Sequence, residues 1–344
     1  MKRLLMTASV LGLIAGPAFA ARDQIHMAGS STVLPYAQIV AEEFGKAYPK
    51  FKAPVVESGG SGAGIKQFCA SVGEDSIDIA NSSRPIKKEE LDTCAQNGVK
   101  DVMEVKFGYD GIVFAWDASM GKIALTTEDV YLGLAAQVPV DGKMADNPNK
   151  TWKQVNDKLP DTPIVAFVPG EKHGTREVFE QKVILAGCAA AKGDAAYMAG
   201  GMNKDDAAKA CVKLRKDGAA VDIDGDYTET LARISANKQA VGVFGLSFYE
   251  NNTDKLKVST VNDIAPSVET VAAGKYPVSR PLFFYIKKAH VGVVPGIMEY
   301  ASFFVSDKIA GAEGPLADYG LVPAPAAELK DIQKAVKAGT TMGK

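Results

Sequence analysis

The chain has 344 residues, with 39 lysines and arginines against 41 aspartates and glutamates, and a formal net charge of −2. This mildly acidic balance argues against a protein that binds nucleic acid or anionic membranes through a broad basic surface. The length exceeds what one ordinary hydrophobic core supports, so two domains are expected.

The first twenty residues have the pattern of a secretory signal. Lys2 and Arg3 precede a short apolar run from Leu4 to Ile14, and Ala18-Phe19-Ala20 supplies small residues for cleavage. The apolar run is too short to be a transmembrane helix. We therefore predict export to the periplasm with cleavage after Ala20, which leaves 37 basic against 41 acidic residues in the mature chain.

Four cysteines remain in the exported chain, and an even number outside the cytoplasm predicts disulfides. The close pairings are Cys69–Cys94 and Cys188–Cys211. Each would close a loop of about two dozen residues and stabilise the fold by about 3 kcal/mol. Free buried thiols are the alternative. A metal site is not expected, because the sequence has no Cys-x-x-Cys pair and its three histidines are far apart.

The mature chain begins with three strand–helix units. Strands are expected at residues 24–28, 53–57 and 77–80, and helices at 33–48, 62–72 and 87–96. This order predicts a parallel sheet flanked by helices. A loop follows each strand, and ligands of open α/β sheets bind beside the carboxyl ends of the strands.

These loops have the composition of anion-binding sites. Ser30-Ser31-Thr32 and Gly59–Gly64 each precede a helix, whose first amides have no partner within the helix, and glycines let the backbone approach a ligand. Gly174-Thr175-Arg176 repeats the design further along the chain. A flexible linker is the alternative for the glycine loop alone, but it does not explain three such loops.

The second part of the mature chain is less regular. Residues 103–116 form a β-rich run interrupted by Gly108-Tyr109-Asp110-Gly111, which we interpret as a strand crossing into a second domain. The alanine-rich residues 188–218 are expected to form short helices held by the second disulfide. The other elements expected are helices at 126–134, 177–185, 228–237, 294–306 and 326–338, a helical turn at 150–159, and strands at 164–168, 240–244 and 282–286.

Four segments carry a family resemblance. Gly29–Val33, Ser58–Gln67, Asp78–Pro85 and His173–Arg176 occur in this order, and together they resemble the periplasmic phosphate-binding proteins of high-affinity phosphate ABC importers. Residues 276–282 also look like that family, and the resemblance covers nearly the whole mature chain. Within the family, Ser-Ser-Arg-Pro and Gly-Thr-Arg loops mark a subgroup.

The resemblance implies a fold and a function. The fold is an α/β type II binding protein with two lobes, each a mainly parallel sheet flanked by helices, joined by a two-segment hinge. Lobe I would comprise residues 21–107 and about 265–344, and lobe II about 108–264. The function implied is a monomeric receptor, without catalysis or a cofactor, that closes over phosphate and delivers it to the permease and ATPase subunits of an ABC importer.

The resemblance also implies the phosphate-binding groups, which are Ser31, Thr32, the Val33 amide, Ser61, the Gly62 amide, Ser83, Gly174 and Thr175. The chain departs from the common pattern in three places. Ser83 stands where many members have aspartate, His173 where they have serine, and Pro169 where they have arginine. We expect Arg84 and Arg176 to supply the positive charge instead, with ordinary ion pairs as the alternative. His173 is a further candidate donor whose charge depends on pH.

A buried carboxylate distinguishes protonated phosphate from sulfate, because sulfate offers it only lone pairs. Asp110 is the first candidate for this acceptor, and a partner for Arg84 or Arg176 is its alternative role. Glu57 and Asp78 are the other candidates, and orientation of the loops is the alternative for both.

Rival functions remain open from the sequence. A receptor for sulfate, arsenate or molybdate is the closest rival, followed by a secreted phosphatase-like enzyme and by a structural or adhesive role. Ile65 separates Gly64 from Lys66, so the glycine loop is not a nucleotide P-loop. Ala63 stands where a G-x-S-x-G nucleophile turn needs glycine. The few histidines also argue against a two-metal phosphatase.

Overall fold

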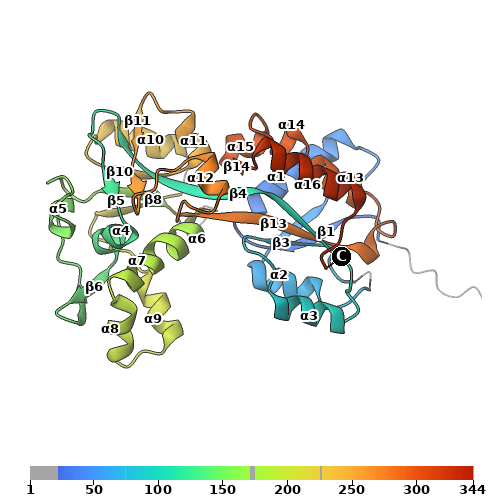
Figure 1. The fold of residues 1–344 in the computed structure, drawn as a ribbon, viewed down its shortest axis with the longest axis horizontal. Coiled ribbons are helices and arrows are strands. Elements are labelled where there is room, and N and C mark those ends of the chain that lie inside the picture. The colour runs from blue at the N-terminus through green and yellow to red at the C-terminus, as the bar shows by residue number, and fades with distance from the viewer. Residues whose placement is uncertain (1–21, 74, 171–174, 225–226, 344) are drawn as a thin grey trace, which may run out of the picture.

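A computed structural model describes residues 22–73, 75–170, 175–224 and 227–343. The expected signal sequence and the binding candidates His173 and Gly174 lie outside these residues. Figure 1 shows two α/β halves joined by the long strands β4 (Val102–Asp117) and β13 (Ser279–Lys287). We call them the β1 lobe and the β8 lobe. The first contains β1 (His26–Gly29), β2 (Val55–Ser58) and β3 (Ile79–Ser82), and the second contains β8 (Ala166–Pro169), β9 (Ala220–Ile223) and β10 (Val241–Gly245). The expected two-lobed α/β fold is therefore confirmed.

The β1 lobe begins with the three expected strand–helix units. Its first elements are β1 (His26–Gly29), α1 (Leu34–Ala47), β2 (Val55–Ser58), α2 (Ser61–Phe68), β3 (Ile79–Ser82) and α3 (Lys88–Gln96). The strands are parallel in the order β2-β1-β3, and Gly29 is in register with both Ser58 and Asn81. The three loops that follow the strands therefore lie side by side at one edge of the sheet.

Local chemistry explains why the first two helices form where they do. In α1, the buried Tyr36, Val40 and Phe44 recur at helical spacing, and Pro35 occupies the first turn, where its missing N–H has no effect. Helix α2 starts on the glycine loop. A Cβ at Gly64 would lie 2.4 Å from the Cα of Gly29, so only glycine lets α2 pack this closely on β1.

Strand β4 is the expected strand that crosses from one lobe to the other, and it continues without a break through Gly108–Gly111. Its first part pairs antiparallel with β13 and its second part with β10 (Val241–Gly245), so one strand belongs to both lobes. Gly108 and Gly111 do not break the strand. They make room for neighbouring side chains, since a Cβ at Gly108 would lie 2.9 Å from Leu321.

The β8 lobe contains the parallel strands β10, β8 and β9, which extend the same sheet beyond β4. The helix expected at 177–185 is in fact a short α-helix, a π-helix and a second α-helix. Neither the β6–β7 hairpin nor β9 was expected, because each of these strands has only four residues. The elements of this lobe are β5 (Ala124–Leu125), α4 (Thr127–Leu134), β6 (Gln137–Val140), β7 (Lys143–Asp146), α5 (Trp152–Val155), β8 (Ala166–Pro169), α6 (Arg176–Val178), the π-helix (Phe179–Ile184), α7 (Leu185–Ala190), α8 (Gly193–Ala199), α9 (Lys204–Cys211), β9 (Ala220–Ile223), α10 (Tyr227–Ala236), α11 (Leu246–Glu250), β11 (Leu256–Val258) and β12 (Thr260–Val261).

The chain then returns to the β1 lobe. Strand β13 lies between β3 and β4, and helices α13 and α16 lie over the same half of the molecule in Figure 1. The elements of this last part are α12 (Val268–Ala272), a 3-10 helix (Lys288–His290), α13 (Ile297–Phe304), α14 (Asp307–Ala310), α15 (Pro315–Tyr319), β14 (Val322–Pro323) and α16 (Ala326–Ala338).

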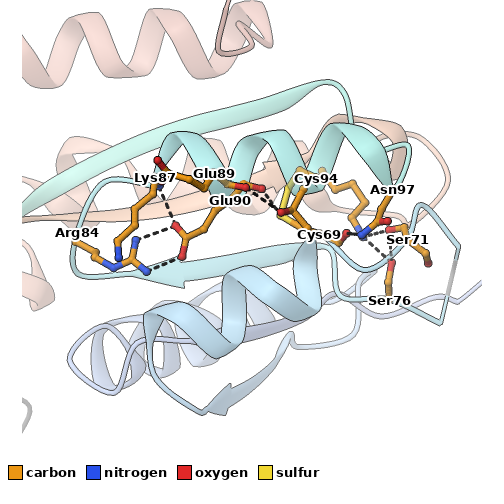
Figure 2. The surroundings of a disulfide bond; sticks show 11 residues. Cys69, Ser71, Ser76, Arg84, Lys87, Glu89, Glu90, Cys94 and Asn97 are labelled. Carbon is orange, nitrogen blue, oxygen red and sulfur yellow. Dashed lines mark hydrogen bonds and ion pairs between the residues drawn. A yellow bond between two sulfur atoms is a disulfide. The ribbon is translucent and has the colours of Figure 1, made fainter. Parts of the chain in front are cut away.

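Both predicted disulfides are confirmed, joining Cys69 to Cys94 and Cys188 to Cys211. Figure 2 shows the first, which ties the end of α2 to α3. In the described part of the chain, no helix has the length and apolar character needed to cross a membrane. The same residues contain no cluster of three or more potential metal ligands.

Candidate functional site: a polar cleft between the lobes

The loop after β1 presents two hydroxyls at the edge of the sheet. The Ser30 amide donates to the Asn81 carbonyl at 2.9 Å, which fixes the loop against β3. Thr32 is buried, whereas Ser31 is exposed. The Val33 amide is 3.4 Å from the Ser30 hydroxyl, so that donor has only a weak internal partner. The loop is thus fixed to the sheet, with the Ser31 side chain exposed and the Thr32 side chain buried.

The other two loops of the edge contact each other. The Ser83 amide donates to the Ser61 hydroxyl at 3.1 Å, and the two hydroxyl oxygens are 3.3 Å apart. Ser61 begins α2, and Ser83 directly follows β3. The structure therefore brings together two serines that the sequence analysis assigned to separate loops.

Arg280 provides the buried positive charge beside these loops. Its side chain is 6% exposed, and its Nη2 donates to the Thr32 hydroxyl at 2.6 Å. The guanidinium projects from β13, one of the two strands that join the lobes. Arg280 lies in the segment 276–282 that resembles the family, but it was not among the expected site residues. Its position beside Thr32 depends on the pairing of β13 with β4, which no local pattern reveals.

Asp110 lies directly across the strand pair from Arg280. The two residues are in register on β4 and β13, and Asp110 Oδ2 is 3.8 Å from Arg280 Nε. Among the described residues, neither carboxylate oxygen of Asp110 has a hydrogen-bond partner. Burial raises the pKa of Asp110 to about 6, against the lowering effect of Arg280. The Asp110 carboxyl group therefore lies beside the Arg280 guanidinium. In the described structure it contacts neither Arg84 nor Arg176.

Glu177 reaches the same place from the other lobe. Its Oε2 accepts hydrogen bonds from Thr32 at 3.0 Å and from Ser31 at 3.3 Å. Its Oε1 accepts a hydrogen bond from Gln181 at 3.1 Å and lies 3.5 Å from Arg280 Nη1. Sequence reasoning missed both Glu177 and Gln181, because they follow the Gly-Thr-Arg motif on an apparently ordinary helix.

A cleft of about 360 Å³, a size suited to a small ligand, adjoins these groups, and Ser61, Ser83, Glu177, Gln181 and Arg280 line it. Both lobes contribute to its wall, and charged or polar side chains dominate it. The lining residues are Ser61, Gly62, Ser83, Arg84, Pro85, Glu177, Gln181, Lys182, Arg280 and Pro281.

Arg84 lines the cleft but already has a strong partner. Figure 2 shows its guanidinium held by both oxygens of Glu90, at 2.7 and 2.9 Å, near the start of α3. Glu90 also accepts a hydrogen bond from the Lys87 amide. The Arg84 guanidinium lowers the pKa of Glu90, so the pair is ionised.

Arg176 points elsewhere in the described structure. It pairs with Glu180 at 2.6 Å and with Asp222 at 2.5 Å, and it donates to the Pro169 carbonyl. It is not among the residues that line the cleft, and it borders a separate cavity of the β8 lobe. Thr175 is buried and accepts a hydrogen bond from the Tyr227 hydroxyl at 3.4 Å.

Asp78 and Glu57, the other proton-acceptor candidates, lie outside this group. Asp78 is fully buried and accepts hydrogen bonds from Arg22, from the His26 amide at 2.7 Å and from His290 at 2.5 Å. Glu57 is exposed on β2. Neither residue lines the cleft.

Comparison with known proteins agrees with this architecture. The model of the PBP superfamily domain matches residues 17–308. The chain belongs to the PBP superfamily. The Phosphate-binding protein PstS of Staphylococcus haemolyticus is 32% identical over 89% of this chain and 84% of its own length. Protein SphX of Synechococcus elongatus is 29% identical over 90% of this chain and 80% of its own length.

Solved structures lead to the same family. A crystal structure described as a possible phosphate binding protein from Planctomyces limnophilus is 26% identical, with a TM-score of 0.68. The alignment covers 92% of this chain and 99% of that one. The fold inferred from the four ordered loops is therefore the fold of this family.

Proposed function

We propose that this protein is a periplasmic receptor that captures inorganic phosphate in the cleft between its lobes. The observation that carries the proposal is the donor set of the cleft: buried Arg280 bonded to Thr32, with two serine hydroxyls on the neighbouring loops. The names of the relatives support phosphate as the ligand. Hydroxyls, amides and one guanidinium suit a tetrahedral oxyanion, because each donor is directional.

In this proposal the β1 lobe provides most of the ligand contacts. Its donors are Ser31, Thr32, Ser61 and Ser83, the amides of Val33 and Gly62, and Arg280. Arg84 contributes at the rim, where Glu90 already holds most of its guanidinium. The roles expected for His173, Gly174, Thr175 and Arg176 remain predictions for the opposite wall.

Asp110 is our candidate for the proton acceptor, acting beside Arg280. A carboxylate with a pKa of about 6 changes charge close to the range in which phosphate loses its second proton. Capture would be followed by hinge closure through β4 and β13 and by delivery to an ABC importer, as the family resemblance implies. We propose no catalysis, a monomer, and lobe boundaries near residues 108 and 264.

Calorimetric titration of the mature chain with phosphate, with and without excess sulfate, tests this function. We expect tight phosphate binding that sulfate does not displace. A parallel assay for hydrolysis of p-nitrophenyl phosphate should show no turnover. Displacement of phosphate by sulfate would favour a general oxyanion receptor, and turnover would favour an enzyme.

A further inference from the structure

The contacts of Glu177 resemble those of a bound anion. Its carboxylate receives hydrogen bonds from Ser31, Thr32 and Gln181 and lies 3.5 Å from the guanidinium of Arg280. Two of these partners, Thr32 and Arg280, are buried and bonded to each other, and Arg280 lines the cleft. This carboxylate on the cleft wall therefore takes donors from both lobes, and Ser31, Thr32 and Arg280 among them are donors that the proposed function assigns to the oxyanion.

Glu177 also connects the two lobes. It belongs to α6, which lies on the side of the β8 lobe that faces the β1 lobe (Figure 1), while Ser31 and Thr32 precede α1. The π-helix at Phe179–Ile184 begins two residues later and carries Gln181, which bonds both Glu177 and Arg280. Wide π-turns of this kind are frequent at functional sites. The segment therefore places an acid and its supporting amide on the cleft wall.

From these contacts we propose that Glu177 is an internal ligand, which occupies the anion-binding donors of the first loop and must be displaced by phosphate. The inference rests on the proposed function for the identity of the external anion. It gives Glu177 a role in setting affinity, because the receptor must break this interlobe contact before it binds. It also predicts that the contact closes the lobes without phosphate.

The size of the expected effect depends on the fraction of molecules in which Glu177 occupies the donors of the first loop. When nine-tenths of the molecules hold Glu177 in the donor set, the apparent dissociation constant for phosphate is about tenfold weaker than the intrinsic one. Removing the carboxylate removes this competition and the repulsion between two negative groups. Glu177→Gln keeps the size of the side chain, and its half-exposed position makes a folding defect unexpected.

The experiment compares wild type, Glu177→Gln and the control Glu269→Gln, which removes one charge from an exposed position on α12. Calorimetry with phosphate should give about tenfold tighter binding for Glu177→Gln and an unchanged constant for the control. Small-angle scattering in phosphate-free buffer should give a larger radius of gyration for Glu177→Gln than for wild type, with equal values once phosphate is bound.

Weaker or unchanged phosphate binding by Glu177→Gln would overturn the proposal, as would an unchanged radius of gyration. A wild type that binds no phosphate would instead overturn the proposed function. In that case the scattering comparison decides the internal-ligand proposal by itself. An expanded Glu177→Gln would support an interlobe latch, and equal radii would reject it.

Discussion

Asp78 and Asp110 are both buried aspartates of the sheet region, but the hydrogen bonds around them differ. Asp78 precedes β3 and is fully buried, with hydrogen bonds from Arg22, His26 and His290. Asp110 lies on β4 and is 1% exposed, yet its oxygens have no hydrogen-bond partner among the described residues. A buried charge with all its partners contributes to stability, whereas one left unsatisfied is a candidate for function.

The arginines differ in the same way. Arg84 is half-buried and bound to both oxygens of Glu90. Arg280 is 6% exposed, and its Nε has no hydrogen-bond partner among the described residues. Its other nitrogens bond Thr32 and Gln181, on opposite sides of the cleft. The arginine with unused capacity is therefore the one on the strand that joins the lobes.

The largest expected effect is on stability, at Asp78. Asp78→Asn should lower the free energy of unfolding by about 3–5 kcal/mol, because it removes a fully buried carboxylate that pairs with Arg22 and accepts hydrogen bonds from the His26 amide and His290. Urea unfolding measures the change. The control Asp92→Asn breaks only an exposed pair with Lys88 and should change stability by less than about 1 kcal/mol. An equally small loss of stability for Asp78→Asn would show that the hydrogen bonds of Asp78 do not distinguish it from Asp110.

In contrast to Asp78, Asp110 should destabilise the folded protein when it is ionised, so its effect on stability depends on pH. Its pKa in the folded protein, about 6, exceeds the ordinary value of 3.8, so the folded state favours the protonated form. This contribution is fully present at acid pH and is lost as the pH rises through about 6. Between pH 4 and pH 7, wild type should therefore lose about 2–3 kcal/mol relative to Asp110→Asn.

Urea unfolding of both proteins at several pH values checks this prediction. The groups that act electrostatically with Asp110 are Arg280, Glu177, Tyr36 and Tyr227. All of them are retained in Asp110→Asn, so their own contributions largely cancel in the comparison. Parallel stability curves for the two proteins would show that Asp110 is not a buried, unsatisfied acid.

Among the residues that line the cleft, Arg280 should contribute most to phosphate affinity. Arg280→Gln removes the guanidinium but keeps a donor, and phosphate affinity should fall about 100-fold, which corresponds to about 2.8 kcal/mol. Calorimetry measures the constant. The control Arg233→Gln, which breaks an exposed pair with Glu229, should bind like wild type. A loss below fivefold for Arg280→Gln would remove this arginine from the site.

The smallest effect is expected at Arg84. Because Glu90 holds its guanidinium, Arg84→Gln should weaken phosphate binding by no more than about threefold. The same titration tests it. A loss as large as that of Arg280→Gln would mean that the Arg84–Glu90 pair rearranges when phosphate binds, and the contrast between the two arginines would fail.

Much of this molecule could be predicted from local sequence patterns. The composition of Ser30-Ser31-Thr32 and of Gly59–Gly64 indicates anion-binding loops after strands, and parallel pairing places them at one edge. Ser83 is expected only from the family resemblance. Arg280 and Glu177 were missed because their roles come from long-range contacts: one pairs across the strands with Asp110, and the other reaches Thr32 from 145 residues away. Spacing in the sequence carries no information about such contacts.

In the proposed function, the donors around Arg280 bind phosphate between the lobes. The most direct measurement is a crystal structure of the mature chain grown with phosphate. We expect phosphate to contact Arg280, Thr32, Ser61 and Ser83, with the Glu177 carboxylate moved away from Thr32. Phosphate bound at Arg176 instead, or Glu177 still bonded to Ser31 and Thr32 beside the ligand, would contradict this account.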